Sequence, residues 1–401
     1  MKILHTADWH IGKSLYKHDL YEDIGLFLDE LIQIIKEEAI DVLVVSGDIF
    51  DLANPSNRDK EIYYQFLTQL TQLKIRTIIT AGNHDSVRML EAPKELLRYL
   101  NIEVVGDASN MEGQVLLLED KSGHIQACIL AVPYLRDRDL RQVNAGEKYE
   151  DRVSATRIGI VKHYETLKAF AQNAGYIGPL IAMGHLYMQG ASLSESERDI
   201  QIGNTAGISV DAFSALFDYM ALGHIHRPQK LNKEGTIRYS GSPISLSFSE
   251  RSDQKQVIIL DIENQEIQSI KSRTLSKNRD LMRINGSVQE IKQQLAVFEN
   301  TKKLIAYIEI HALEKERDHI KILELINLAQ QESEQYKIIH HKIQFEENKQ
   351  GLIDQGHDKS IEEMKPIDVF RSKLNDEIQE EELKKSLELK FLELVDELHQ
   401  S

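Results

Sequence analysis

The chain contains 401 residues, of which 41% are hydrophobic and 28% are charged, a composition that excludes a disordered or fibrous protein. Its 64 acidic residues outnumber the 48 basic ones and give a net charge of −16; this argues only weakly against nucleic-acid binding, because bound divalent cations reverse the sign of a carboxylate-lined site. No apolar run approaches the roughly 18 residues of a membrane span and the first residues lack a signal region, so we expect a cytoplasmic protein without a membrane partner.

Residues 1–226 repeat one pattern, in which a short apolar run rich in β-branched residues is followed at once by a polar cluster. In chain order the clusters read HTADWH, GDIFD, AGNHD, GHLY and GHIH. The stretches between the runs are helix-like; in residues 23–39, for example, apolar side chains recur at helical spacing. Alternating strands and helices predict an α/β fold, in which the carboxyl ends of neighbouring strands converge and bring the clusters together.

The five predicted strand ends all supply aspartate, asparagine or histidine. One such residue is usually a polar corner or a satisfied core histidine, but five independent strand ends favour a metal site. Oxygen and imidazole ligands without thiolates suit manganese, iron or zinc in a reactive site. Four glycines directly precede candidates, where the absent side chain would let the backbone turn beneath a metal: Gly47, Gly82, Gly184 and Gly223. The candidates are Asp8, His10, Asp48, Asn83, His84, Asp85, His185, His224 and His226.

Beyond residue 276 the sequence predicts a small second α/β domain without a further metal-like cluster, and then a linker with few large apolar residues. The acidic tail carries two apolar helical faces, from which we select Phe370, Leu374, Phe391 and Leu394. We interpret these faces as a protein-docking element, the alternative being a helix pair folded onto its own domain. The predicted parts are residues 1–275, residues 276–345, a linker at 346–365 and a helical tail at 366–401.

Basic residues that could contact a polyanion are harder to select, because exposed lysine and arginine are common on any surface. Several follow the predicted motif strands in loops and would surround the candidate site: Lys13, Lys17, Arg58, Lys60, Arg88 and Arg136. Each is also consistent with a solvated surface charge, so none is counted among the predicted site residues.

The ordered series DWH, GDIFD, GNHD, GH and GHIH resembles the calcineurin-like metallophosphoesterases over residues 1–250. The resemblance implies a β-sandwich flanked by helices, with two divalent metals at the strand ends. It implies three ligands for a first metal, three for a second and one bridging aspartate. These are, in that order, Asp8, His10 and His226; Asn83, His185 and His224; and Asp48.

Three further residues complete the implied site. His84 would act on the scissile phosphate rather than on a metal, either by stabilising the transition-state charge or by protonating the leaving oxygen. Asp51 would orient His84, although some related nucleases carry histidine at that position. The role of Asp85 stays open between a site residue and a structural cap or salt-bridge partner.

Three longer segments, HTADWHIGK, SGDIFDLANPS and SGSPISLSFSE, resemble a narrower family, the nuclease subunits of bacterial SbcCD DNA-repair complexes. This resemblance implies a two-metal, manganese-dependent exonuclease and endonuclease on double-stranded DNA ends and hairpins, serving DNA repair, recombination and replication. It also implies a homodimer within a heterotetramer with an SMC-like SbcC ATPase. Residues 276–345 would form a cap that seats DNA, and the tail would bind the ATPase.

Two other functions stay open at this point. A metabolite or cyclic-nucleotide phosphodiesterase would use the same metals, but it would have less use for the chain beyond residue 270. A scaffold for an ATPase with a vestigial site is disfavoured, because every ligand position is filled. Protein phosphatases would read GDxVDRG and GNHE, whereas this chain has GDIFDLA and GNHD.

Overall fold

The computed structural model of the chain describes residues 1–140, 149–198, 200, 207–314 and 319–345, and five tail positions: Phe370, Leu374, Lys384, Leu387 and Phe391. The chain divides into two compact units, Met1–Phe345 and Glu346–Ser401. Among the described residues, no helix combines the length and the apolar character that crossing a membrane requires.

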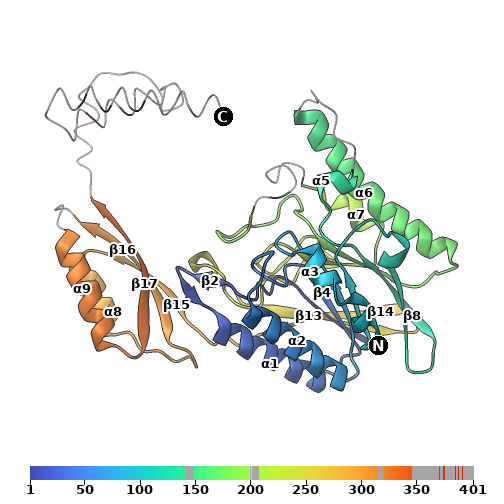
Figure 1. The fold of residues 1–401 in the computed structure, drawn as a ribbon, viewed down its shortest axis with the longest axis horizontal. Helices are drawn as coiled ribbons and strands as arrows, with labels where there is room; N and C mark the ends of the chain where they lie inside the picture. Colours follow the sequence, from blue (N-terminus) through green and yellow to red (C-terminus); the bar gives the residue numbers. More distant parts are fainter. Residues whose placement is uncertain are drawn as a thin grey trace. The chain divides into compact units, whose positions relative to one another are not determined.

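Two six-stranded sheets form the body of the first unit (Figure 1). The strands of the first sheet are β1 (Lys2–Thr6), β4 (Val42–Ser46), β5 (Arg76–Thr80), β6 (Ile102–Val105), β13 (Gln256–Glu263) and β14 (Glu266–Thr274). They lie in the order β14-β13-β1-β4-β5-β6, in which β1, β4, β5 and β6 run parallel and β13 and β14 are antiparallel to their neighbours.

The second sheet has a parallel centre with one antiparallel strand at each edge. Its strands are β7 (Val115–Glu119), β8 (Ile125–Ala131), β9 (Leu180–His185), β10 (Tyr219–Gly223), β11 (Gln229–Lys230) and β12 (Ile237–Tyr239). The order is β11-β12-β10-β9-β8-β7, with β12, β10, β9 and β8 parallel.

The central strands are buried on both faces, because each sheet lies between the other sheet and a layer of helices. Along β4, Leu43 and Val45 belong to the core beneath the helices, whereas Val42 and Val44 share a second core with Ile181 of β9. The alternation of side chains along a strand produces this division. The predicted β-sandwich flanked by helices is confirmed.

Helices cover the outer faces of both sheets, and short elements join them. The helices are α1 (Tyr21–Glu37), α2 (Asn57–Gln72), α3 (Val87–Glu91), α4 (Lys94–Tyr99), α5 (Asp137–Leu140), α6 (Tyr149–Asn173) and α7 (Asp211–Ser214). The short elements are β2 (Ser14–Leu15), β3 (His18–Asp19), η1 (Glu112–Gln114) and η2 (Phe248–Glu250). Phe27 of α1 joins the core of the first sheet, and Tyr164 of α6 joins that of the second.

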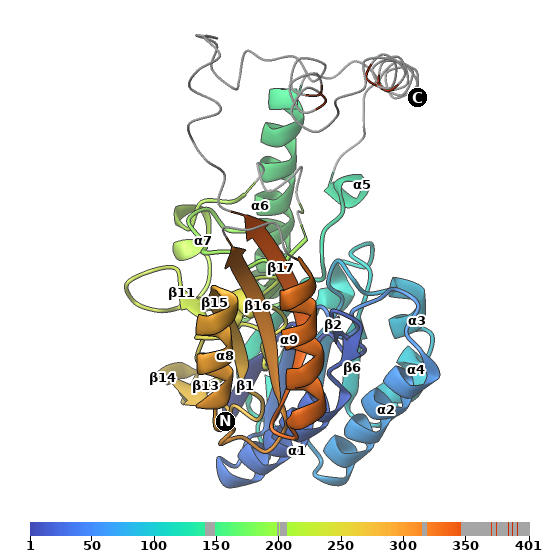
Figure 2. The same cartoon turned by 90° about the vertical axis from the view of Figure 1, so that its left-hand side faces the viewer.

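A third, three-stranded parallel sheet follows the sandwich in the chain. Its elements are β15 (Leu281–Gly286), α8 (Val288–Ala296), β16 (Ala306–Glu314), α9 (His319–Glu332) and β17 (Tyr336–Phe345). Both helices lie on one face of the sheet (Figure 2), and Ile308 and Ile310 of β16 share a core with Ile291 of α8 and Ile326 of α9. Arg279 attaches this sheet to α1, because its buried guanidinium donates to both carboxylate oxygens of Asp23 at 2.8–3.0 Å.

The division at residue 276 stays a prediction, as does the separate tail. β14 ends at Thr274 and the third sheet has its own core, yet residues 1–345 form one compact unit. In the tail, the rings of Phe370 and Phe391 stack with centroids 4.1 Å apart and planes 9° apart, and Leu374 is 8% exposed. Leu394 and the linker at 346–365 lie outside the described residues.

Candidate metal centre

The ends of five strands supply the candidate site residues. Asp8 and His10 follow β1, Asp48 follows β4, and GNHD follows β5 in the first sheet, while His185 ends β9 and GHIH follows β10 in the second. Their side chains are buried, apart from that of Asn83, which is partly exposed. Residues from five separate stretches of the sequence therefore meet in one buried cluster.

The backbone at these strand ends is unusual. Asp8, His10, Asp48 and His224 have φ values of 55°, 46°, 50° and 98°, in the region that favours glycine. Residues held there cost on the order of 1–3 kcal/mol each and concentrate at functional sites. Gly82 serves close approach instead, because a Cβ there would lie 2.1 Å from Asp48 Oδ1. The glycine therefore leaves space for a candidate ligand.

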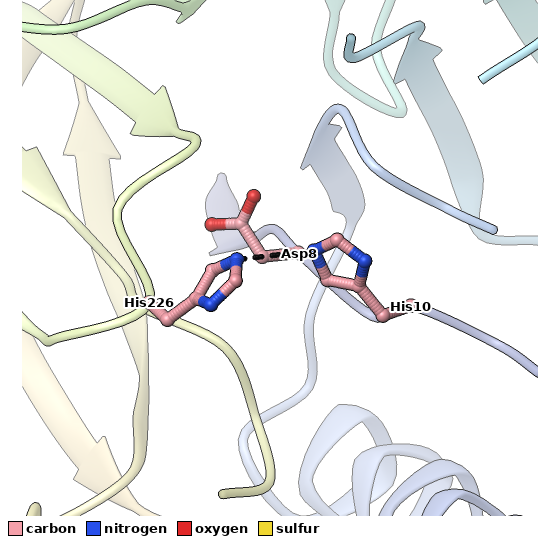
Figure 3. Close-up of side chains that lie close together, drawn as sticks. All are labelled: Asp8, His10 and His226. Carbon is pink, nitrogen blue, oxygen red and sulfur yellow. Dashed lines mark hydrogen bonds between the residues drawn. The ribbon is translucent and has the colours of Figure 1, made fainter. Parts of the chain in front are cut away.

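Asp8, His10 and His226 form a first group, in which one potential ligand atom from each lies within 4.8 Å of the others. The Nε2 atoms of His10 and His226 are 3.1 Å apart, and the two rings point toward each other beside the Asp8 carboxylate (Figure 3). Asp8 uses Oδ1 to accept a hydrogen bond from the His224 main-chain N–H at 2.8 Å. Its Oδ2 is buried and has no hydrogen-bond partner among the described residues.

Asn83, His185 and His224 form a second group around one oxygen atom. Asn83 Oδ1 lies 2.9 Å from His185 Nε2 and 3.2 Å from His224 Nδ1. His224 Nε2 is buried, and no described residue forms a hydrogen bond with it. Asp48 lies between the groups, since its Oδ2 is 3.5 Å from His10 Nε2 and 3.3 Å from His185 Nε2. This aspartate therefore faces both groups at once.

The charges and orphan atoms of this cluster fit divalent cations. Burial raises the pKa of Asp8 to about 7. Burial would also raise the pKa of Asp48, but the neighbouring His185 holds it well below its usual range, and Asp48 in turn raises the pKa of His185 to about 9 against the effect of burial. A buried polar atom without a partner is costly, so Asp8 Oδ2 and His224 Nε2 indicate positions where a ligand supplies the missing contact.

His84 lies beside both groups, and its ring is fixed by residue 51. Its Nδ1 donates to the main-chain oxygen of Asp51 at 2.7 Å, whereas the Asp51 carboxylate is 3.9 Å away. That carboxylate instead lies 3.3 Å from His10 Nδ1 and 3.1 Å from Lys13 Nζ. Residue 51 therefore contacts His84 through its backbone, while its side chain contacts a candidate ligand. Burial lowers the pKa of His84 to about 4.

Asp85 has a structural role in the same region. Its carboxylate accepts hydrogen bonds from the main-chain N–H groups of Ile49, Phe50 and Gly82 at 2.8–3.1 Å. These bonds join the GDIFD segment to the GNHD segment and hold Asp48 beside Asn83. This favours the structural alternative for Asp85.

Two residues that the sequence did not indicate, Ser196 and Glu197, contact His226. Ser196 Oγ is 2.6 Å from His226 Nδ1, and Glu197 Oε1 accepts from the His226 main-chain N–H at 2.9 Å. Both residues lie in a polar segment between β9 and α7 that has no periodic pattern. The sequence contains no signal that would connect this segment to a histidine thirty positions later.

The basic residues predicted around the site lie in different places in the structure. Arg58 and Lys60 lie within α2 rather than in a loop, and the Arg58 guanidinium stacks over the Tyr21 ring. Arg88 and Arg136 line a polar cleft of about 770 Å³ that reaches Asn83. Lys94 also lines this cleft, as do the acidic Asp85, Glu91 and Asp107, so the candidate centre opens onto a cleft of mixed charge.

Comparisons with known proteins identify sequences and structures that are similar to this chain. Residues 1–228 match the family model described as calcineurin-like phosphoesterase. The chain is 33% identical to the SbcD subunit of nuclease SbcCD from Escherichia coli (strain K12) over 303 residues, covering 74% of this chain and 73% of that protein. It is 32% identical to the SbcD subunit from Bacillus subtilis (strain 168) over 285 residues, covering 71% and 72%. A crystal structure of a dimetal phosphatase from Danio rerio aligns with a TM-score of 0.42 at 12% identity, covering 69% of this chain and 96% of that one.

Proposed function

Because the chain belongs to the calcineurin-like phosphoesterases and, within them, to the family of SbcD nuclease subunits, we propose that its buried Asp and His cluster cleaves DNA with two divalent metals. The observation that carries this proposal is the convergence of seven residues with oxygen or imidazole ligand atoms, three of which have a buried polar atom without a hydrogen-bond partner among the described residues. The activity is a metal-dependent phosphodiester hydrolysis, performed together with an SbcC-like ATPase.

The ligand assignment follows the two groups of side chains. Asp8, His10 and His226 would hold the first metal, and Asn83, His185 and His224 the second. Asp48 would bridge them, since two closely spaced dications need an anion between them. When bound, the metals would lower the pKa of a coordinated water and neutralise the charge on the phosphodiester oxygens. The imidazole rings would each offer a nitrogen lone pair to a metal. The buried side chains around the cluster exclude bulk water.

His84 would act on the phosphate rather than on a metal. Its Nδ1 is occupied by the Asp51 carbonyl oxygen, which fixes the plane of the ring. The phosphate anion beside it would raise the low pKa of the free ring, because an opposite charge favours the protonated form. His84 would then donate to a phosphate oxygen or to the leaving oxygen.

The likeness to nuclease subunits supports DNA rather than a small diester as the substrate. The cleft of about 770 Å³ beside Asn83 has Arg88 and Arg136 on its walls together with three acidic residues, and these two arginines would contact phosphates beside the scissile bond. Manganese as the metal, exonuclease and endonuclease action on double-stranded ends and hairpins, and roles in repair, recombination and replication belong to this proposal. A homodimer within a heterotetramer and a place in the cytoplasm are predictions of the same kind.

A substrate comparison tests this function. The purified chain is incubated with radiolabelled hairpin and linear duplex DNA, bis-p-nitrophenyl phosphate and cyclic nucleotides, each with manganese, magnesium or chelator. We expect metal-dependent DNA cleavage, and Arg88→Glu should weaken it while leaving hydrolysis of the small diester unchanged. Turnover of cyclic nucleotides without DNA cleavage would establish the small-molecule phosphodiesterase. A metal-loaded chain that hydrolyses no phosphoester would establish the scaffold.

We also propose that the tail docks on the ATPase through its apolar side chains, which include the stacked Phe370 and Phe391 rings. Removing residues 360–401 should leave a folded chain that still hydrolyses the small diester but no longer binds the ATPase. Each apolar side chain buried in such a complex contributes about 1.5–3 kcal/mol. Phe391→Glu should weaken the complex strongly. A truncated chain that melts far lower, together with a Phe391→Glu chain that binds at full strength, would show a tail folded onto its own domain.

A further inference from the structure

His226 is connected to a buried carboxylate through one hydroxyl group. Its Nδ1 lies 2.6 Å from Ser196 Oγ, and the same oxygen lies 2.6 Å from Glu250 Oε1. A carboxylate can only accept, so Ser196 donates its proton to Glu250 and accepts the Nδ1 proton of His226. This direction places a proton on His226 Nδ1, so Nε2, which lies 3.1 Å from His10 Nε2, is the ring atom that is left to bind a metal.

Glu250 is held in place by contacts on both oxygens. Its side chain is fully buried, and its Oε2 accepts from Lys255 Nζ at 2.6 Å, Ser242 Oγ at 3.2 Å and the Leu246 main-chain N–H at 3.2 Å. Burial would raise the pKa of Glu250, but the Lys255 ammonium holds it well below its usual range. Lys255 Nζ also donates to the His226 main-chain oxygen at 3.0 Å. The carboxylate is therefore ionised and rigid, and it is connected to both the ring and the backbone of His226.

The histidines of the two groups are oriented by different kinds of partner. In the first group, His10 Nδ1 faces the Asp51 carboxylate, and His226 Nδ1 reaches the Glu250 carboxylate through Ser196. In the second group, His185 Nδ1 donates to the main-chain oxygen of Ser46 at 2.9 Å. Both first-group rings therefore have a side-chain carboxylate behind Nδ1, whereas the hydrogen bond of His185 Nδ1 goes to a main-chain oxygen, which a side-chain substitution does not remove.

We propose that Glu250, acting through Ser196, is a positioning residue that orients His226 and sets the affinity of the first metal. The proposal rests on the two-metal function above and adds residues to it. Partners that lie behind a metal-binding histidine fix its tautomer and ring orientation, and their loss typically lowers metal affinity about 10–100-fold. It also gives a reason for the motif SGSPISLSFSE, which ends at Glu250 and supplies Ser242 and Leu246 to hold it.

Manganese titration of the full chain tests this assignment, with free manganese measured by electron paramagnetic resonance. The wild type should bind two equivalents. Ser196→Ala should keep one site at wild-type affinity and weaken the other about 10–100-fold. Ser196→Thr, which restores a hydroxyl group, should recover the second equivalent. Ser249→Ala is the matched control, since Ser249 Oγ contacts Ser247 Oγ and the Glu195 N–H rather than His226.

Glu250→Gln should reproduce the one-site loss if the chain folds, but it removes the partner of Lys255, so Ser196→Ala decides the question. Two sites of wild-type affinity in Ser196→Ala would overturn the proposal. Equal weakening of both sites with a lower melting temperature would also overturn it, because it would indicate a merely structural role. A wild-type chain that binds fewer than two equivalents would instead contradict the two-metal function itself.

Discussion

Two buried carboxylates of the first unit, Asp48 and Glu309, have opposite surroundings. Glu309 of β16 is paired with the Arg283 guanidinium, lies 3.3 Å from His311 Nε2 and accepts from Tyr16 Oη at 3.2 Å. Asp48 faces histidine rings and the main-chain N–H of His84, and no lysine or arginine of the described ranges pairs with it. Glu309 thus has a permanent counter-ion, whereas the charge around Asp48 depends on titratable rings. A buried cluster of titratable groups therefore indicates a metal site only where no lysine or arginine neutralises its carboxylates.

The largest expected effect comes from removing the Asp48 carboxylate. Asp48→Ala should lose both metals and essentially all hydrolysis, because it removes the anion that lies between the two groups. Metal analysis of the purified variant and an assay with bis-p-nitrophenyl phosphate measure the two losses. If this variant retained two equivalents of manganese, Asp48 would not bridge the metals. It would then not differ from Glu309 in its effect on metal binding.

The next effect separates chemistry from metal binding within the same cluster. His84→Gln should retain both metals and lower the cleavage rate at least about 10²–10³-fold, the range seen when one donor to a developing negative charge is removed. Single-turnover cleavage and manganese titration are measured on the same preparation. Metals lost in proportion to activity would place His84 among the ligands.

Glu309→Gln sharpens the comparison from the other side. It should leave metal binding and hydrolysis of a small diester unchanged, but it should lower the free energy of unfolding by about 1.5–3 kcal/mol, since Arg283 loses a charged partner. Urea unfolding followed by circular dichroism gives the value. If this variant lost manganese, Glu309 would not be a purely structural carboxylate, and the contrast with Asp48 would be wrong.

Tyr16→Phe should have the smallest effect. It removes one hydroxyl donor to Glu309 while the ring can still stack on His340, where the centroids lie 3.9 Å apart and the planes 2° apart. The free energy of unfolding should fall by no more than about 0.5–1.5 kcal/mol. A larger fall than that of Glu309→Gln would mean that the hydroxyl group, and not the arginine, completes the Glu309 environment.

The apolar runs predicted an α/β fold and the residues that meet at its strand ends, because each candidate directly follows a run that specifies a strand, whereas the sandwich itself was implied by the resemblance to the metallophosphoesterases. Strand ends are fixed by local pattern, and parallel strands bring them together. The partners of these residues were less accessible. The bond from His84 goes to the backbone of residue 51, which carries no side-chain signature, and Ser196, which contacts His226, lies in a segment without a periodic pattern.

The position of residue 82 has a consequence for mutational tolerance. Any side chain there would collide with the Asp48 carboxylate, so a library of random variants should find position 82 as intolerant as position 48. Yet glycine has no group that could bind, donate or accept at the side chain. A survey of variant fitness would therefore not distinguish Gly82, which leaves space, from Asp48, which is the candidate ligand. Metal binding measured on a folded Gly82→Ala chain would distinguish them.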